Sequence, residues 1–264
     1  MWRKEGDGMN YETIEFTTED GIGTLTLNRP KVMNALNSKM RAEIAQALTD
    51  LSGDLRCVVL TGSGAAFCSG QDLTDAGAAI DLEATLRDEY EPMLHAVRNC
   101  PVPVIAAVNG VAAGAGANLA LVADVVIAAE SASFIQAFTR IGLIPDAGGT
   151  WAIPRAVGAA RAMGMMLFAD AIPARKAADW GLIWEAVPDE DFTGIVADRA
   201  RHLAQGPTSA YLSVRQAVSA SFDNDLDAQL KLEANLQGQA GRSGDFREGV
   251  TAFLEKRKPR FTGK

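Results

Sequence analysis

Short apolar runs that alternate with helical segments limit the fold of this chain more than any other feature. Runs with the length and β-branched content of buried strands lie at 57–60, 102–108 and 125–129. Residues 22–27 instead alternate apolar with polar or small residues, as a half-buried strand does. Strands separated by helices are typical of a largely parallel sheet covered by helices. The sequence therefore predicts an α/β fold.

Helical spacing is clearest after Asn37 and Ser38, which suit the N-cap of a helix. The apolar residues that recur there at helical spacing are Met40, Ile44, Ala47, Leu48 and Leu51. From about Arg199 onward the strand pattern fades and helical patterns replace it. We predict these C-terminal helices at 202–204, 210–220, 226–236 and 246–256, with interruptions at Gly206–Pro207 and Gly238. Their leucines offer more apolar surface than a short appendage buries alone, so we expect a partner for that face.

Composition limits the partners and the compartment. With 264 residues the chain can form one large domain or a domain with an appendage. Its net charge of −8 argues against binding to nucleic acid or to an anionic membrane surface. Its apolar runs fall short of the ~20 residues that span a bilayer. The three cysteines lack paired spacing, which favours the cytoplasm and predicts no metal site.

The start of the chain is charged and lacks the apolar core of a secretion signal. We expect residues 1–8 to form a disordered extension, with Met9 as an alternative start to Met1.

Two glycine-rich loops, at 61–73 and 109–117, each follow a predicted strand. The second leads into a helix, and a helix start presents free backbone N–H groups to an anion. Two such loops can direct two backbone donors at one oxygen atom and so form an oxyanion hole. The same glycines also fit a purely structural role in tight turns.

Asp146 lies in a loop shaped by glycine and proline and surrounded by apolar residues. Poor hydration there raises the proton affinity of a carboxylate toward the range of a general base. Ordinary turn chemistry is the competing explanation. His95 and His202 have no evident catalytic partner and no nucleophile elbow is present, so a Ser/His hydrolase is the weaker interpretation.

From about Tyr11 to the C-terminus the chain resembles the crotonase (enoyl-CoA hydratase/isomerase) superfamily. The segments that carry the resemblance are 27–36 (LNRPKVMNAL), 66–73 (AFCSGQDL), 105–110 (IAAVNG) and 177–182 (AADWGL). Within the superfamily the chain is most similar to the phenylacetate-pathway isomerases of ring-1,2-epoxyphenylacetyl-CoA. That closer likeness is carried by 143–151 (LIPDAGGTW), 180–184 (WGLIW), 240–243 (AGRS), 247–250 (REGV) and 261–264 (FTGK).

The resemblance implies a ββα spiral core with the active site at 9–198 and a C-terminal helical oligomerisation region at 199–264. It further implies a homotrimer, or a hexamer built as a dimer of trimers. The substrate would be an acyl-CoA thioester, with no further cofactor and no metal.

The resemblance also assigns roles within the site. The backbone N–H groups of Gln71 and Ala115 would hold the thioester oxygen, and Asp146 would be the catalytic carboxylate. The two glutamates of the hydratases correspond here to Asn118 and Phe138, neither of which can act as a base. The residues expected to bind substrate or CoA are Arg29, Lys31, Val32, Ala35, Ser69, Gly70, Asp72, Leu73, Asn118, Phe138 and Lys256.

Some of these positions have a second interpretation. Arg29 and Lys31 could contact the CoA phosphates or lie on a solvated loop, and the residues alone favour neither. Asp72 more simply braces its loop through backbone hydrogen bonds. Lys256 would reach a neighbouring subunit's CoA by resemblance, whereas the sequence alone indicates a solvated end.

A single carboxylate suits the movement of a proton from one carbon to another, so we expect an isomerase. The expected reactions are ring-1,2-epoxyphenylacetyl-CoA to its oxepin isomer and 3-enoyl-CoA to 2-enoyl-CoA. Two alternatives stay open. One is hydration or another crotonase chemistry such as thioester hydrolysis, and the other is a non-catalytic CoA-binding subunit.

Overall fold

Two sheets form the centre of the computed structural model, which describes residues 11–75 and 81–264. The larger sheet has the order β1 (Ile14–Glu19), β2 (Ile22–Leu27), β3 (Cys57–Gly62), β5 (Val104–Val108), β7 (Val125–Ala129) and β10 (Glu185–Val187). The smaller sheet contains β4 (Ala66–Cys68), β6 (Val111–Ala113), β8 (Ser133–Ile135) and β9 (Ile172–Pro173). Apart from the antiparallel pairs β1–β2 and β8–β9, neighbouring strands are parallel. The predicted α/β class is confirmed.

The two sheets are built in alternation along the chain. Each of β3, β5 and β7 in the larger sheet is followed directly by β4, β6 or β8 in the smaller one. Gly62 and Gly110 lie at these crossings, and a Cβ atom at Gly110 would come within 2.2 Å of the Ala65 carbonyl oxygen. The chain therefore advances from layer to layer as a spiral, and the loops after the short strands gather at one place.

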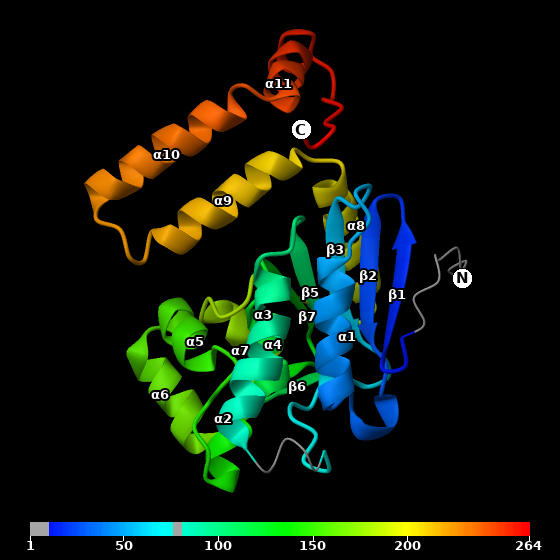
Figure 1. The fold of residues 1–264 in the computed structure, drawn as a ribbon, viewed down its shortest axis with the longest axis vertical. Helices are drawn as coiled ribbons and strands as arrows, with labels where there is room; N and C mark the ends of the chain where they lie inside the picture. The colour runs from blue at the N-terminus through cyan, green and yellow to red at the C-terminus, as the bar shows by residue number, and fades with distance from the viewer. Residues whose placement is uncertain (1–10, 76–80) are drawn as a thin grey trace.

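Helices cover the sheets and extend the chain beyond them (Figure 1). They are α1 (Ser38–Thr49), α2 (Leu82–Thr85), α3 (Glu91–Arg98), α4 (Ala115–Leu121), α5 (Gly149–Val157), α6 (Ala159–Phe168), α7 (Ala174–Asp179), α8 (Phe192–Ala204), α9 (Thr208–Ala220), α10 (Leu226–Ala240) and α11 (Gly244–Leu254). The described residues also contain two 3-10 turns, at Pro30–Val32 and Ala137–Ile141, and a π-helical turn at Leu86–Tyr90. Over the part of the chain that is described, no helix combines the length and the apolar character needed to cross a membrane.

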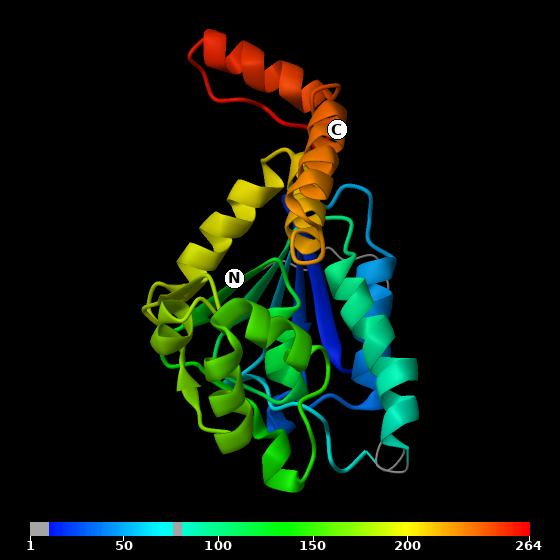
Figure 2. The ribbon, with the colours of Figure 1, turned by 90° about the vertical axis from the view of Figure 1, so that its left-hand side faces the viewer.

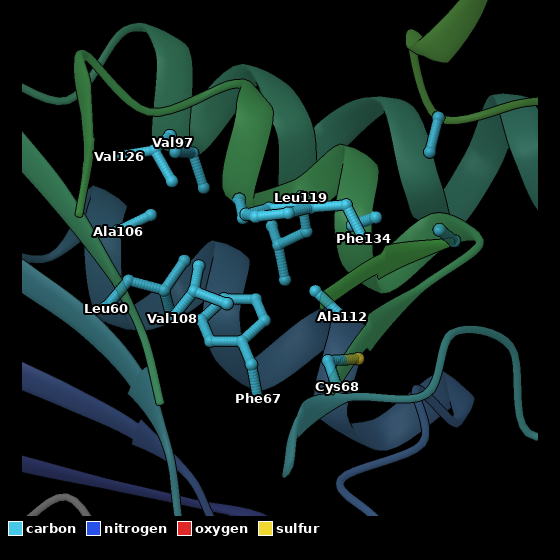
Figure 3. Close-up of a cluster of buried hydrophobic side chains, with 14 of the residues drawn as sticks. Leu60, Phe67, Cys68, Val97, Ala106, Val108, Ala112, Leu119, Val126 and Phe134 are labelled. Atoms are coloured by element: carbon cyan, nitrogen blue, oxygen red, sulfur yellow. The ribbon is translucent and has the colours of Figure 1, made fainter. Parts of the chain in front are cut away.

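The main core lies between the two sheets and the helices that cover them. Figure 3 shows Leu60 and Val108 of the larger sheet facing Phe67 and Ala112, with Leu119 of α4 closing the cluster. Each of these side chains is at most 1% exposed. Burial of large apolar side chains supplies about 1.5–3 kcal/mol each. This packing fixes α4 and β4 against each other, which matters for the site below.

Helix α1 begins where the sequence predicts. The Asn37 side-chain oxygen accepts a hydrogen bond from the Met40 N–H at 2.9 Å, so Asn37 is the N-cap. Met40, Ile44 and Leu48 are buried, as their spacing predicts.

The C-terminal helices agree with the predictions in number but not in every boundary. Gly206 and Pro207 separate α8 from α9 as expected, whereas α10 continues through Gly238 to Ala240. The interruption predicted at Gly238 is wrong, because a glycine within a helix costs only about 1 kcal/mol relative to alanine. The proposed division at 198/199 falls inside α8, which packs on the larger sheet through Val196 and Ala200. Figures 1 and 2 show α10 and α11 at one end of the molecule, away from the sheets.

The terminal segment 261–264 folds back onto the start of α11. The carboxylate of the buried Asp245 accepts hydrogen bonds from the N–H groups of Thr262 at 2.7 Å and Gly263 at 2.8 Å. The hydroxyl of Ser209 donates to the Gly263 carbonyl oxygen at 2.6 Å. The tail therefore joins α11 to the beginning of α9. The extension predicted at 1–8 lies outside the described residues.

Candidate active site

A first free backbone amide belongs to Gln71, in the loop after β4. Leu36 and Gln71 form an isolated parallel bridge, in which Leu36 N–H donates to Gly70 at 2.8 Å and Asp72 N–H donates to Leu36 at 3.0 Å. In this pattern the N–H of Gln71 itself faces away from Leu36. Among residues 11–75 and 81–264, no hydrogen-bond acceptor pairs with that N–H.

A second free amide is that of Ala115, the first residue of α4. The preceding Gly114 is the N-cap, with φ 52° and ψ −129°, and it supplies no side-chain cap. The first N–H groups of a helix have no partner within the helix, so that of Ala115 is available to a ligand. Because the start of a helix carries the positive end of the helix dipole, the Ala115 N–H also favours a negatively charged group.

The loops that carry these two amides are in contact. A Cβ atom at Gly70 would lie 2.8 Å from the Ala113 carbonyl oxygen and 3.4 Å from the Ala115 nitrogen. Gly70 also has φ +95°, which favours glycine. A side chain at Gly70 would therefore separate the Gln71 segment from the start of α4.

The Asp146 loop is fastened to the same helix. The backbone oxygen of Asp146 accepts hydrogen bonds from Asn118 Nδ2 at 2.8 Å and from Gly149 N–H at 2.9 Å. Gly149 packs so closely that a Cβ atom there would lie 2.5 Å from Asn118 Nδ2. Helix α4 thus carries Ala115 at its start and fixes Asp146 through Asn118, one turn later.

The environment of Asp146 favours its protonated form. Its Oδ1 is buried and finds no hydrogen-bond partner within the described part of the chain. Burial raises the pKa of Asp146 from its ordinary value of 3.8 to about 6. A carboxyl group with such a pKa can both accept and return a proton near neutral pH.

Asn118 and Phe138 occupy different kinds of position. Asn118 is 1% exposed, and its Oδ1 accepts a hydrogen bond from Gln136 Nε2 at 2.9 Å. Both ends of its amide are therefore used by the protein. The ring of Phe138 is buried beside Gly114, where a Cβ atom would lie 3.7 Å from the ring. Phe138 thus adds an apolar surface next to the start of α4.

Asp72 and Arg29 hold the first loop together. Asp72 accepts hydrogen bonds from the Thr74 hydroxyl at 2.6 Å and from Arg29 Nη1 at 2.8 Å. These contacts, the Thr74 bond first, lower the pKa of Asp72. Arg29 Nη1 also donates to the Ala35 carbonyl oxygen at 2.6 Å. Asp72 also accepts a hydrogen bond from the Thr74 backbone N–H at 3.0 Å, the kind of contact that the bracing interpretation expects, and the Arg29 guanidinium serves the same loop.

The remaining predicted binding residues lie in three kinds of position. Val32 and Ser69 are adjacent, since the Ser69 hydroxyl donates to the Val32 carbonyl oxygen at 3.3 Å. Lys31 and Leu73 are exposed, and no ion pair of Lys31 occurs within the residues that the structure describes. Lys256 comes two residues after α11, the helix that Figures 1 and 2 show at one end of the molecule, away from the sheets.

Four structural residues of the site were missed in the sequence, namely Asn34, Arg41, Tyr90 and Gln136. Asn34 and Arg41 are fully buried, and Gln136 is 1% exposed. Arg41 carried a usable signal, because it shares the buried face of α1 with Ile44 and Leu48. An arginine on such a face needs buried partners. The other three carry no local signal of their role.

Known proteins are similar to this chain over nearly its whole length. The profile of the enoyl-CoA hydratase/isomerase family matches residues 17–264. The chain is 62% identical over 257 residues to a Rhodobacter capsulatus protein named "probable enoyl-CoA hydratase", covering 97% of this chain and 100% of that one. It is 50% identical to the 1,2-epoxyphenylacetyl-CoA isomerase of Escherichia coli over 260 residues, which cover 96% and 99% of the two chains. The crystal structure of an enoyl-CoA hydratase from Bacillus anthracis has 32% sequence identity, covers 96% of this chain and 100% of that chain, and superposes with a TM-score of 0.89.

Proposed function

The chain belongs to the enoyl-CoA hydratase/isomerase family, and we propose that it is an acyl-CoA isomerase in which Asp146 moves a proton between carbon atoms. One observation carries the proposal. Within the described residues the buried Oδ1 of Asp146 has no partner, and the backbone oxygen of the same residue is bound by Asn118 of the helix whose first amide is free. That arrangement supports a base acting beside an oxyanion hole.

The proposed reaction begins when the N–H groups of Gln71 and Ala115 donate to the thioester carbonyl oxygen. They stabilise the enolate that forms as Asp146 removes a proton from C2 of a 3-enoyl-CoA. Protonated Asp146 then returns a proton to C4, and the double bond moves from C3–C4 to C2–C3. The reaction is balanced without water or another cofactor.

The acyl group is the finer part of the proposal. Two candidates are ring-1,2-epoxyphenylacetyl-CoA, converted to its oxepin isomer, and unbranched 3-enoyl-CoA. The first is supported by the 50% identity to the Escherichia coli isomerase and by the buried ring of Phe138 beside Gly114.

Hydration is the second candidate, because the relative at 62% identity carries a hydratase name. Asn118 and Phe138 argue against it. The Asn118 amide is engaged with Asp146 and Gln136, and a phenyl ring cannot activate water. Asp146 is then the single carboxylate left for the hydration of an alkene, a step for which, by the resemblance, the hydratases use two glutamates.

Product analysis tests the proposal directly. Purified protein is incubated with trans-3-hexenoyl-CoA and with trans-2-hexenoyl-CoA, in water and in D2O, and products are identified by mass spectrometry. An isomerase gives a 2-enoyl-CoA of unchanged mass in water, with deuterium incorporated in D2O. A product heavier by one water would instead establish a hydratase. Tight binding without either change would favour a non-catalytic subunit. The same incubation with the labile ring-1,2-epoxyphenylacetyl-CoA tests the other candidate acyl group.

The pH dependence of turnover follows from the pKa of Asp146. Because the base must be ionised in the free enzyme, kcat/KM for trans-3-hexenoyl-CoA is expected to rise with pH through about 6 and to level above about 7. Initial rates between pH 4.5 and 8.5, with circular dichroism to confirm folding at each pH, measure this. A flat profile down to pH 5 would contradict the assignment.

Substitution of Phe138 separates ring-bearing from linear substrates. Phe138→Leu is expected to lower kcat/KM for the epoxide up to about tenfold more than for trans-3-hexenoyl-CoA, because the bulkier cyclic acyl group buries more apolar area against the phenyl ring, at about 0.8 kcal/mol per buried CH2. Phe138→Ala should enlarge the difference, at a cost in stability. Equal effects on the two substrates would show that Phe138 does not select the acyl group.

We further propose that the protein acts as a homotrimer or hexamer in the cytoplasm, without a cofactor besides its CoA substrate. The exposed apolar side chains of the C-terminal helices support assembly. Leu226 is 72% exposed and Phe253 is 81% exposed in the single chain. Lys256 would then approach the CoA of a neighbouring subunit.

A further inference from the structure

Arg41 is a fully buried arginine whose guanidinium ends at the candidate oxyanion hole. Its Nη1 donates to the Leu36 carbonyl oxygen and to Gln71 Oε1, each at 2.9 Å. Its Nε and Nη2 donate to Glu89 at 3.0 and 2.6 Å, and Nη2 lies 3.5 Å from Asp75. Four of the five N–H donors of the group therefore form hydrogen bonds, and the Asp75 carboxylate lies close to Nη2 as an ion-pair partner.

Tyr90 makes the second contact to the same atom of Gln71. Its hydroxyl donates to Gln71 Oε1, and its ring lies under the Arg41 guanidinium, 4.8 Å from it. A π-helical turn places Glu89 and Tyr90, which are neighbours in the chain, so that both contact Arg41. Single π-helical turns are frequent at functional sites because they redirect side chains within a helix.

We propose that the side chain of Gln71 is a positioning group that fixes the backbone N–H of the same residue toward the thioester oxygen. The inference rests on the proposed function. Arg41 and Tyr90 both donate hydrogen bonds to Gln71 Oε1. On the backbone, Leu36 forms hydrogen bonds with the two residues on either side of Gln71, Gly70 and Asp72. The Arg41 guanidinium also donates to the Leu36 carbonyl oxygen, so it contacts both residues of the Leu36–Gln71 bridge.

This arrangement has a consequence for catalysis. The benefit of an oxyanion donor depends on its being aligned before the charge develops. Rotation of the peptide that carries the Gln71 N–H is opposed by the bond from Leu36 to the Gly70 carbonyl oxygen. The anchored side chain adds to this restraint, because its Nε2 donates to the Asp72 carbonyl oxygen at 3.2 Å. Loss of the side-chain anchor should therefore weaken the polarisation of the carbonyl while leaving most contacts with CoA in place.

A purely structural network is the competing explanation, since a buried arginine needs partners in any protein. The two explanations differ in one measurable quantity, the stretching frequency of the bound thioester carbonyl. A structural network supports stability but does not set that frequency. Phenylacetyl-CoA labelled with 13C at the thioester carbon is a suitable probe, because it binds without an alkene to isomerise.

The test compares Gln71→Met, Tyr90→Phe and their combination with the wild type. Gln71→Met keeps the backbone N–H and removes the anchor, so we expect kcat to fall about 10- to 100-fold with KM changed less than about threefold. The carbonyl frequency should return toward that of free phenylacetyl-CoA. Tyr90→Phe should show a smaller change in the same direction, and the double variant should be no worse than Gln71→Met, because both remove the same hydrogen bond.

Ser38→Ala is the matched control. Its hydroxyl donates to Glu89 and so touches the network at the end remote from Gln71. The carbonyl frequency and kcat of this variant should equal those of the wild type. Equal effects in Ser38→Ala and Gln71→Met would overturn the inference in favour of a structural network.

The outcomes separate this inference from the proposed function. If the wild type shifts the carbonyl frequency and Gln71→Met abolishes the shift, the positioning role stands even where no isomerisation is found. If Gln71→Met retains the wild-type frequency, the positioning role is wrong although isomerisation is observed. If the wild type itself binds without any shift, the Gln71 amide does not contact the carbonyl and the inference fails.

Discussion

Asp146→Asn is expected to lower kcat for the isomerisation of trans-3-hexenoyl-CoA by about three to four orders of magnitude. A positioned general base contributes about 10²- to 10⁴-fold, and here the same group must both remove and return the proton. Asparagine keeps the size of the side chain, and the backbone oxygen of residue 146 can still accept from Asn118 and Gly149. Single-turnover rates of the wild type and the variant measure the effect.

The same substitution should stabilise the protein, with a defined dependence on pH. The folded-state pKa of Asp146 is about 6 against an ordinary value of 3.8, so the folded state binds more protons between these values. Stability is therefore lost as pH rises from about 4 to about 6. Asp146→Asn avoids this loss, and we expect it to raise the free energy of unfolding by up to about 3 kcal/mol above pH 7, and by only about 1 kcal/mol near pH 4.5.

Urea unfolding at pH 4.5, 6 and 8 provides that measurement. Asp170→Asn is the control, because Asp170 is exposed and forms no ion pair within residues 11–75 and 81–264. It should change neither activity nor stability appreciably. An Asp146→Asn protein that is stabilised but fully active would show that Asp146 is a turn residue and that the base lies elsewhere.

Asn34→Ala is expected to cost about 3–5 kcal/mol of the free energy of unfolding. Asn34 is fully buried, and its Nδ2 donates to the carbonyl oxygens of Ser63, Ala66 and Phe67 at 2.9–3.1 Å. Its Oδ1 accepts from the Arg29 N–H at 2.9 Å. Alanine would leave these groups buried without partners, and it tolerates the φ of 56° less well than asparagine.

Asn28→Ala is the matched control for this prediction. Asn28 also makes a side-chain hydrogen bond, to Glu15 at 2.9 Å, but that bond is exposed to solvent. Its loss should cost less than about 1 kcal/mol. Urea unfolding of the two variants compares the buried with the exposed amide. A cost below about 1 kcal/mol for Asn34→Ala would mean that the loops it joins are held by other contacts.

The local pattern determined much of the fold. Residues 22–27 and 125–129 form β2 and β7 with the predicted bounds, because strand alternation and strand-length apolar runs depend on near neighbours. Asn37 is the N-cap of α1 for the same reason, since an N-cap acts within one turn. The interruption predicted at Gly238 is absent from α10, because the hydrogen bonds along the rest of this helix outweigh the cost of one glycine.

The site was determined by the sequence only in part. The two glycine-rich loops and the apolar surroundings of Asp146 could be recognised from short segments, and the raised pKa agrees with the burial expected there. The contacts that hold these segments together could not be recognised. The Leu36–Gln71 bridge and the bond from Asn118 to the Asp146 backbone oxygen join residues far apart in the chain, and only the spiral of alternating sheets brings them within reach.

Arg41 shows the difference most clearly. The sequence places an arginine on the buried face of a helix and so requires partners for it. It does not say which partners, because Gln71 and Glu89 follow 30 and 48 residues later along the chain. Residue type and spacing thus determined the elements and the chemical groups. The tertiary structure alone decided which groups meet, since hydrogen bonds and burial act over a few ångströms in space and not along the sequence.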